Sequence, residues 1–294
     1  MSAFTKATKK ATRARIALCG PSGSGKTYTG LTLACALGDR VAVIDTERGS
    51  ASKYVGVNGW QFDTVAPGSF APDSLTGLLA EAGSDGYNVV LLDSWSHYWM
   101  GVDGMLEQVD RRAKSGNSFS GWKEVRPDER RMIDALIAFP GHVIATLRVK
   151  TEYVIEENER GKKVPRKVGL KPEQRDGIEY EFDLVGDMDL DNTLTVSKSR
   201  IPALSRQVIR EPGVDLAAQV ASWLTEGETV PDARELRERA LKADMGELVA
   251  LAGEARQLGI DNAAVPGLDG QPTSLVNLIR GRYTELEAAP KESA

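Results

Sequence analysis

The chain has 294 residues, of which 41% are hydrophobic and 27% are charged, and its formal net charge at pH 7 is −5. This composition is typical of a soluble globular protein, and the length suffices for one large domain with a small appendage. The negative charge argues against a uniformly basic nucleic-acid-binding surface but leaves room for a local basic groove, and we find no apolar run near the ~20 residues that a membrane-spanning helix needs.

The two cysteines and the N-terminus indicate a cytoplasmic protein. Cys19 falls in a predicted strand and Cys35 in a predicted helix, where cysteines are usually buried hydrophobic residues and not a disulfide pair. The first fifteen residues are basic, but the apolar run that follows them is too short for a signal peptide. We therefore expect a reducing, cytoplasmic environment.

The first half of the chain alternates between strand and helix patterns. Short, continuously apolar runs predict buried strands, and longer segments with apolar residues at helical spacing predict helices. The expected strands cover residues 15–19, 41–45, 61–65, 88–93 and 142–147, and the expected helices cover residues 27–37, 72–82 and 127–139. This order predicts an α/β fold with a mostly parallel central sheet between layers of helices.

The pattern changes after Lys150, where alternating segments joined by charged turns predict appended antiparallel strands. These segments are residues 151–155, 163–168, 182–189, 193–197 and 207–209, and a closing helix is expected at 215–225. Two further helices are expected at 232–258 and 274–288. We predict a basic arm (1–14), an α/β core (15–226), a linker (227–231) and a small helical C-terminal region (232–294).

A glycine-rich loop between the first strand and the first helix matches the phosphate-binding pattern GxxxxGK[ST]. Its glycines let backbone N–H groups surround phosphates, and the following helix directs the positive end of its dipole at them. We expect Lys26 to contact the β- and γ-phosphates of ATP and the Thr27 hydroxyl to bind Mg²⁺. The loop comprises Gly20, Pro21, Ser22, Gly23, Ser24, Gly25, Lys26 and Thr27.

Two carboxylates follow buried strands that should end beside this loop. Asp93 closes the apolar run 89–92, where it would hold the metal, and a helix cap or turn role is the alternative. Glu47 follows the strand 41–45, and the carboxyl ends of parallel strands meet at the ligand. Glu47 is therefore the candidate for polarising the water that attacks the γ-phosphate, although a carboxylate after a strand is also common at surfaces.

Polar and basic residues downstream complete the candidate site. Thr146 ends the strand 142–147 and is a candidate γ-phosphate sensor, and Arg148 and Lys150 lead into a basic segment. That segment is either a DNA-contacting loop or a solvated loop. Further along the chain, Lys198 and Arg200 form either a pair that reaches a neighbouring subunit's nucleotide or a charged strand edge. The basic candidates for DNA contact are Arg148, Lys150, Lys162, Lys163, Arg166 and Lys167.

These motifs, in this order, resemble the RecA-like recombinase core over residues 14–226, and most closely the compact phage and prophage ATPases implicated in single-strand annealing. The resemblance implies ATP-dependent binding of single-stranded DNA by a ring or filament inside a bacterial host cell. It also implies that Glu47 is the catalytic carboxylate, that Thr146 replaces the family's sensing amide, and that Lys198 and Arg200 act across a subunit interface. Residues 94–122 occupy the place of the first DNA loop, and their aromatics either stack on bases or pack a helix.

Two other functions remain compatible with the motifs. A phosphate-loop ATPase can serve as a helicase loader, a defence factor or a packaging factor and respond to a protein partner instead of DNA. A nucleotide-gated binding module would turn over little ATP. The C-terminal helices, acidic by count of their charges, are the candidate docking site for a single-strand-binding protein or another replication or recombination factor.

Overall fold

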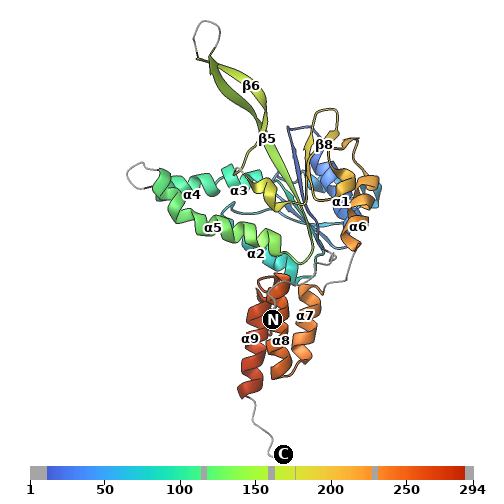
Figure 1. Ribbon diagram of the computed structural model, residues 1–294, viewed down its shortest axis with the longest axis vertical. Coiled ribbons are helices and arrows are strands. Elements are labelled where there is room, and N and C mark those ends of the chain that lie inside the picture. Colours follow the sequence, from blue (N-terminus) through green and yellow to red (C-terminus); the bar gives the residue numbers. More distant parts are fainter. Residues whose placement is uncertain (1–11, 114–117, 158–162, 176, 227–230, 289–294) are drawn as a thin grey trace, which may run out of the picture.

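The computed structural model describes residues 12–113, 118–157, 163–175, 177–226 and 231–288, with only the backbone given for 151–171. These residues form a nine-stranded sheet in the order β3-β2-β4-β5-β1-β7-β8-β9, with β6 paired to β5 (Figure 1). The strands are β1 Arg15–Gly20, β2 Val41–Asp45, β3 Asp63–Val65, β4 Val89–Asp93, β5 His142–Glu157, β6 Lys163–Pro172, β7 Leu184–Met188, β8 Thr193–Ser199 and β9 Val208–Arg210. The predicted α/β class is confirmed.

Helices cover both faces of this sheet (Figure 1). The α-helices of the described chain are α1 Lys26–Leu37, α2 Pro72–Ser84, α3 Ser96–Met100, α4 Met105–Arg112, α5 Ser118–Ala138, α6 Val214–Thr225, α7 Ala233–Lys242, α8 Met245–Leu258 and α9 Leu275–Ala288. Short 3₁₀ helices are η1 Ala51–Tyr54, η2 Val57–Gly59, η3 Ile178–Glu181 and η4 Pro202–Leu204, and β10 Ala264–Pro266 pairs with β11 Pro272–Ser274.

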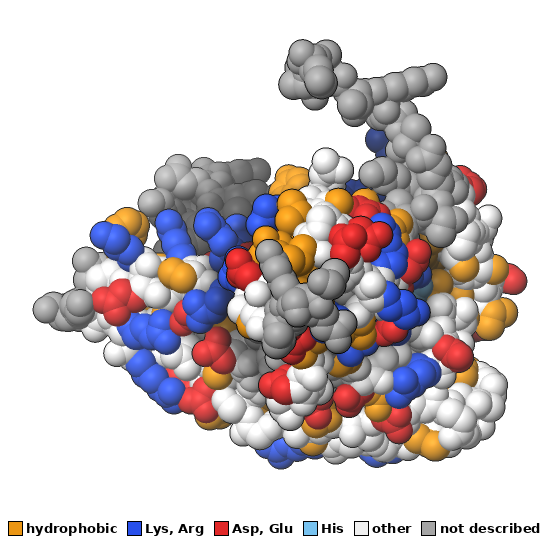
Figure 2. Space-filling model, turned by 90° about the horizontal axis from the view of Figure 1, so that it is seen from below, with side chains coloured by type: hydrophobic (Ala, Val, Ile, Leu, Met, Phe, Trp, Pro, Cys, Tyr) orange, Lys and Arg blue, Asp and Glu red, His pale blue; other side chains and the backbone are white. Residues whose placement is uncertain are grey.

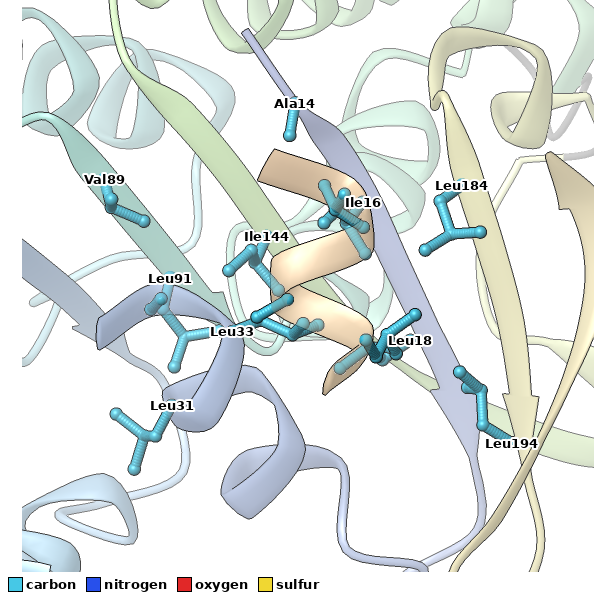
Figure 3. Packing of buried hydrophobic residues seen from close by; sticks show 14 of the residues in the cluster. Ala14, Ile16, Leu18, Leu31, Leu33, Val89, Leu91, Ile144, Leu184 and Leu194 are labelled. Atoms are coloured by element: carbon cyan, nitrogen blue, oxygen red, sulfur yellow. The ribbon is translucent and has the colours of Figure 1, made fainter. Parts of the chain in front are cut away.

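Successive residues of each central strand face opposite layers, which explains why these strands read as continuously apolar. Ile16 and Leu18 of β1 pack with α1 and α6, whereas Ala17 and Cys19 pack with α2, α4 and α5. Figure 3 shows the first of these clusters, in which Leu33 of α1 lies over the strands. A strand buried on both faces fixes the loop at its carboxyl end.

Two segments differ from the predicted antiparallel strands. Residues 151–155 are not a separate strand, because β5 continues without a break from His142 to Glu157 and pairs antiparallel with β6. Residues 184–188, inside the predicted strand 182–189, form β7, which pairs antiparallel with β8 as expected but also pairs parallel with β1 on its other side. Alternating polarity does not indicate which strand will be the neighbour, because parallel and antiparallel pairing both satisfy the backbone N–H and C=O groups.

Helix boundaries were wrong at two places. Pro127 was expected to begin its helix, but α5 starts at Ser118 and contains this proline. Close packing against α4 stabilises the turns of α5 that precede Pro127. At Gly121 the two helices are so close that a Cβ would lie 2.3 Å from the Val109 carbonyl oxygen of α4. The segment 232–258 is two helices, since Asp244 caps α8 with a capping box that interrupts the run.

The C-terminal helices α7, α8 and α9 enclose a third buried cluster of their own, which contains residues 233–279 alone. β10 and β11 contact α2, and Arg234 Nη2 donates to the Tyr87 carbonyl at 2.6 Å. The predicted division at 227–231 stays a prediction, because residues 227–230 lie outside the described ranges. Among the helices that the structure describes, none combines the length and apolarity needed to cross a membrane.

Candidate active site

The predicted phosphate loop lies between the end of β1 and the start of α1. Its shape requires glycine: Gly23 and Gly25 have φ values of 83° and 84°, and a Cβ at Gly25 would lie 2.6 Å from the Asn192 Oδ1 atom. A Cβ at Gly20 would lie 2.5 Å from the Ser24 Oγ atom. The loop closes on itself through Ser24, whose hydroxyl donates to the Pro21 carbonyl at 2.9 Å. A tight, side-chain-free turn before a helix is the geometry that binds phosphates.

Lys26 places its charge on this loop. Its ammonium donates to the Pro21 carbonyl at 2.8 Å, across the turn. Burial lowers the pKa of Lys26, and the nearby carboxylates of Asp93 and Glu47 act in the opposite direction by favouring the charged form. A cation that is partly removed from water interacts strongly with a polyphosphate.

The two predicted metal ligands touch each other. Thr27 Oγ1 donates to Asp93 Oδ2 at 2.7 Å, and Thr146 Oγ1 donates to the other carboxylate oxygen of Asp93. Asp93 is 1% exposed, and its burial raises the pKa of the carboxyl while the two hydroxyl bonds oppose that rise. Thr146 is also fully buried, and its hydroxyl donates to Asp93.

This pair fits Mg²⁺ through the chemistry of its donors. A hydroxyl and a carboxylate supply hard oxygens, and protein-bound Mg²⁺ takes its remaining ligands from water and substrate phosphates. Within the described ranges, no cluster of three or more His, Cys, Asp and Glu side chains could hold a metal on its own.

Glu47 forms an ion pair that the sequence did not reveal. Arg148 Nε donates to Glu47 Oε1 at 2.9 Å, and Arg148 Nη2 donates to Glu47 Oε2 at 2.5 Å. Burial opposes ionisation of Glu47, but the hydrogen bonds and charge of Arg148 outweigh it and lower the pKa of this carboxyl. The same bonds raise the pKa of Arg148. Glu47 is thus held as a carboxylate, in a fixed orientation, at the end of β2.

The backbone around Glu47 is fixed by Asp45 and Thr46. The buried Asp45 carboxylate accepts from the Glu47 and Ala51 N–H groups at 2.8 and 3.1 Å. Thr46 Oγ1 accepts from the Ser94 N–H at 2.6 Å and lies 2.5 Å from His97 Nδ1. These bonds tie the end of β2 to the end of β4, so Glu47 and Asp93 keep a defined separation.

A cavity of about 1180 Å³ surrounds the loop and these carboxylates. One wall comes from the β2 side and contains an aromatic cluster in which the Tyr28 ring lies 5.1 Å from Trp60 and 5.9 Å from Tyr54. The opposite wall contains Asn192, from the β7–β8 turn, and residues 211–214, which precede and begin α6. Neither wall carries a motif, and sequence reasoning missed both.

Lys198 and Arg200 lie away from this loop. In the register of the sheet, Lys198 of β8 faces Val185 of β7, next to the amino-terminal half of β1. The Lys198 ammonium donates to three backbone carbonyls of residues 179, 180 and 182 at 2.7–2.9 Å. Arg200 Nη1 lies 2.8 Å from Asp183 Oδ1. These cations are outside the site of their own subunit, and their action across an interface stays a prediction.

The other basic candidates lie on or next to one hairpin, which projects from the sheet (Figure 1). Arg148 and the exposed Lys150 are on β5, and the backbones of Lys163, Arg166 and Lys167 are on the paired strand β6. Lys162 lies outside the described residues. A role of this hairpin in DNA contact stays a prediction.

The aromatic segment after β4 is largely core. Trp95 is 2% exposed and Tyr98 is fully buried, so the packing interpretation is confirmed for both. Trp99 is only partly buried, and its ring centroid lies 5.6 Å from that of Trp122.

The family model described as "AAA domain" matches residues 12–208 of this chain. The chain belongs to the AAA domain family. It is therefore a P-loop NTPase domain, a class that generally binds ATP with Mg²⁺, and the matched range holds the loop together with Asp93, Glu47 and Thr146. No curated protein matches the chain.

Proposed function

We propose that this AAA-domain protein is a Mg²⁺-dependent ATPase that acts on single-stranded DNA in phage-type recombination or annealing, in the cytoplasm of a bacterial host. One observation carries the ATPase assignment: Lys26, Thr27, Asp93 and Glu47 converge at the carboxyl ends of β1, β2 and β4. Phosphoryl transfer needs positioning and charge compensation more than covalent chemistry, and these four groups supply both.

Each group has a separate role in the proposed hydrolysis. The loop and Lys26 hold the phosphates, and Glu47 orients a water for attack on the γ-phosphorus, with ADP and phosphate as products. Thr27 and Asp93 would hold Mg²⁺, which would offset negative charge on the phosphates. Thr146 keeps the Asp93 carboxylate in place, so it acts here as a positioning residue.

The geometry also gives the nucleotide a direction. Asp93 and Glu47 lie on the β4–β2 side of the loop, so the γ-phosphate belongs there. The base then points to the other wall of the cavity, toward Asn192 and residues 211–214. An amide and backbone groups at that wall provide donors and acceptors for a base edge.

Support for DNA stimulation comes from the continuity of β5. Arg148, which holds Glu47, is on the strand that continues into the basic β5–β6 hairpin. A polyanion bound along this hairpin would compete with Glu47 for Arg148 or shift the strand that bears it. DNA binding would in this way free the carboxylate for the attacking water.

The decisive experiment is an ATPase assay with and without single-stranded DNA over a range of salt concentrations. We expect hydrolysis to rise with DNA and the rise to fade as salt increases, because counterion release drives phosphate binding. Hydrolysis without stimulation even at low salt would contradict the DNA role. Stimulation by a protein partner instead would favour a loader, defence or packaging factor, and negligible turnover would favour a nucleotide-gated module.

Assembly is the second part of the proposal. We infer a homo-oligomeric ring or filament in which Lys198 and Arg200 contact the nucleotide of a neighbouring subunit. Both lie at the end of the sheet opposite to their own loop, which supports action in trans. The C-terminal helices, which have their own core, are the proposed docking site for a single-strand-binding protein or another replication or recombination factor.

A further inference from the structure

A second groove, of about 690 Å³, lies between α5 and the segment that follows β6, apart from the nucleotide cavity. One end combines the Trp99–Trp122 pair with Arg126 and Arg130. Figure 2 shows Lys and Arg side chains gathered at the end of the molecule where α4 and α5 lie. The proposed hydrolysis and assembly assign no role to this groove, and the choice between base stacking and helix packing is still open for Trp99 and Trp122.

The two tryptophans form one aromatic platform. Their ring centroids are 5.6 Å apart at an interplanar angle of 32°, and both side chains are partly buried against the hydrophobic cluster under α5. This separation leaves no space for a third ring between them, so a ligand would stack on the outer side of the pair. Every nucleobase has a π face that such a platform accepts.

Cations continue along the same stripe of the helix. Trp122, Arg126 and Arg130 are four residues apart, so their side chains follow one another on one face of α5. Both arginines are exposed and line the groove. Asp134 and Glu181 line it further along, toward Ile137, and restrict a polyanion to the tryptophan end. This charge arrangement suits one or two phosphates beside a stacked base.

Two of the described residues that line the groove have buried acceptor atoms without a hydrogen bond. In the part of the chain that the structure describes, Glu129 Oε1 and Gln174 Oε1 are buried and have no hydrogen-bond partner. Glu129 is 8% exposed and forms an ion pair with Arg175, whose Nε lies 3.6 Å from Glu129 Oε1, beyond hydrogen-bond distance. Leaving such groups unpaired costs free energy, so the site favours a ligand with N–H donors.

The groove is connected to the nucleotide cavity by adjacent residues. Glu173 lines the nucleotide cavity and its N–H donates to the Arg148 carbonyl at 2.7 Å, whereas Gln174 and Arg175 line the groove. A ligand that moves residues 174 and 175 would therefore move the neighbour of the Glu47–Arg148 pair.

We propose that this groove takes one unstacked base of a DNA single strand, with Trp99 and Trp122 stacking on the base and Glu129 and Gln174 accepting hydrogen bonds from its exocyclic amino group. Arg126 and Arg130 contact the flanking phosphates. Adenine, cytosine and guanine carry such an amino group, but thymine does not, so the groove discriminates against thymine. This inference rests on the proposed action on single-stranded DNA.

The first test is the binding of labelled 20-residue oligo-dC and oligo-dT to the full chain with ATP, measured by fluorescence anisotropy. We expect oligo-dC to bind about tenfold more tightly than oligo-dT, because one base-edge contact gives discrimination of this order. Glu129→Gln should reduce that preference, since an amide presents a donor beside its acceptor. Equal affinities of the wild type for both oligonucleotides would overturn the base assignment.

The second test separates stacking and phosphate contact from folding. Trp122→Ala should weaken binding about tenfold and Trp122→Phe should restore most of it. Arg126→Ala combined with Arg130→Ala should lower the slope of log affinity against log salt by about 1.4, or about 0.7 for each phosphate contact. Arg131→Ala is the matched control, because Arg131 is bonded to Asp128 on the same helix, and the slope should not change.

Two outcomes distinguish the groove from the wider function. If the wild type binds DNA and the Arg126→Ala, Arg130→Ala variant keeps its affinity and salt slope, the groove proposal is wrong while the DNA role stands. If the wild type binds no oligonucleotide at low salt, the DNA role itself fails. Thermal unfolding of each variant identifies loss of structure, and the arginine variant, altered only at exposed positions, decides the question if Trp122→Ala does not fold.

Discussion

The pair formed by Glu47 and Arg148 is the most informative contact at the scale of single residues. The two donors of Arg148 match the two oxygens of the carboxylate, a bidentate geometry that fixes both orientation and charge. Because Arg148 is 41% exposed at its side chain, water screens the pair, and its value to folding is modest. Its importance is for the site, because each carboxylate oxygen of Glu47 already accepts a hydrogen bond from Arg148.

We predict that Glu47→Gln preserves ATP binding and lowers the hydrolysis rate by about 10²–10⁴-fold, the range expected for loss of a general base. Lys26→Ala should instead weaken binding itself, because it removes a charge from the phosphate loop. Equilibrium binding of a fluorescent ATP analogue and phosphate release measure the two quantities separately. Glu81→Gln, on α2, is the surface control, and a Glu47→Gln enzyme with full turnover would show that another group orients the water.

At the scale of elements, a neutral histidine adds a hydrogen bond beside the β1–β5 ladder. His142 Nδ1 accepts from the Ala14 N–H at 3.0 Å, and burial, followed by the charges of Arg13 and Arg15, lowers the pKa of His142 to about 4. Arg15 in turn donates to the carbonyls of Ile137, Phe139 and Gly141, which closes the carboxyl end of α5. The end of α5, the start of β1 and His142 are therefore connected by one set of hydrogen bonds.

This arrangement predicts a pH dependence of stability. Between pH 6.5 and about 4 the unfolded chain binds a proton at His142 that the folded chain does not, so stability falls as pH falls through this window. The loss is about 2–3 kcal/mol by pH 4, and nearly all of it arises below about pH 7. Urea unfolding at pH 7.5 and 5 should show a smaller difference for His142→Asn, whose amide oxygen can still accept from Ala14. An equal pH difference in both proteins would contradict this origin.

The break between α7 and α8 depends on one cap. Asp244 accepts from the Glu247 N–H at 2.8 Å while Glu247 Oε2 accepts from the Asp244 N–H at 2.9 Å. We predict that Asp244→Ala destabilises the C-terminal region by about 1 kcal/mol, whereas Asp244→Ser, another good capping residue, costs less. Hydrogen exchange of amides in α8 checks this locally, and unchanged exchange in Asp244→Ala would show that tertiary packing alone fixes the start of α8.

At the scale of the whole molecule, the fold gathers its chemistry at one edge. Five parallel pairings among β3, β2, β4, β5, β1 and β7 bring strand ends from distant parts of the sequence to the loop. Lys198 and Arg200 lie at the opposite edge of the sheet from the loop. If subunits stack end to end, each chain therefore contributes its loop to one nucleotide site and its two cations to the site of a neighbouring subunit.

The trans arrangement makes a prediction about mixtures. Glu47→Gln subunits and Arg200→Ala subunits should each hydrolyse little ATP alone, but mixing them should restore part of the activity. A hybrid interface then pairs an intact Glu47 from one subunit with an intact Arg200 from the other. Steady-state hydrolysis over a range of mixing ratios measures this, and a simple average of the two inactive proteins would exclude action of Arg200 in trans.

The sequence by itself determined the features whose residues are adjacent in the chain. The phosphate loop, the strand that ends in Asp93 and most helices follow from local pattern, because glycine conformations and hydrophobic periodicity act over a few residues. Pro127 and residues 232–258 show the limit of this reasoning: packing against α4 and a cap at Asp244 decided where those helices begin and end.

Only the tertiary structure decided which distant residues meet. Glu47 and Arg148 are 101 positions apart, and their contact exists because β2, β4 and β5 are neighbours in the sheet. The same holds for the parallel β7, the three carbonyls around Lys198, and the groove where Trp99 and Trp122 face residues from beyond β6. Strand order and helix packing are collective choices of the whole core, and no local pattern encodes them.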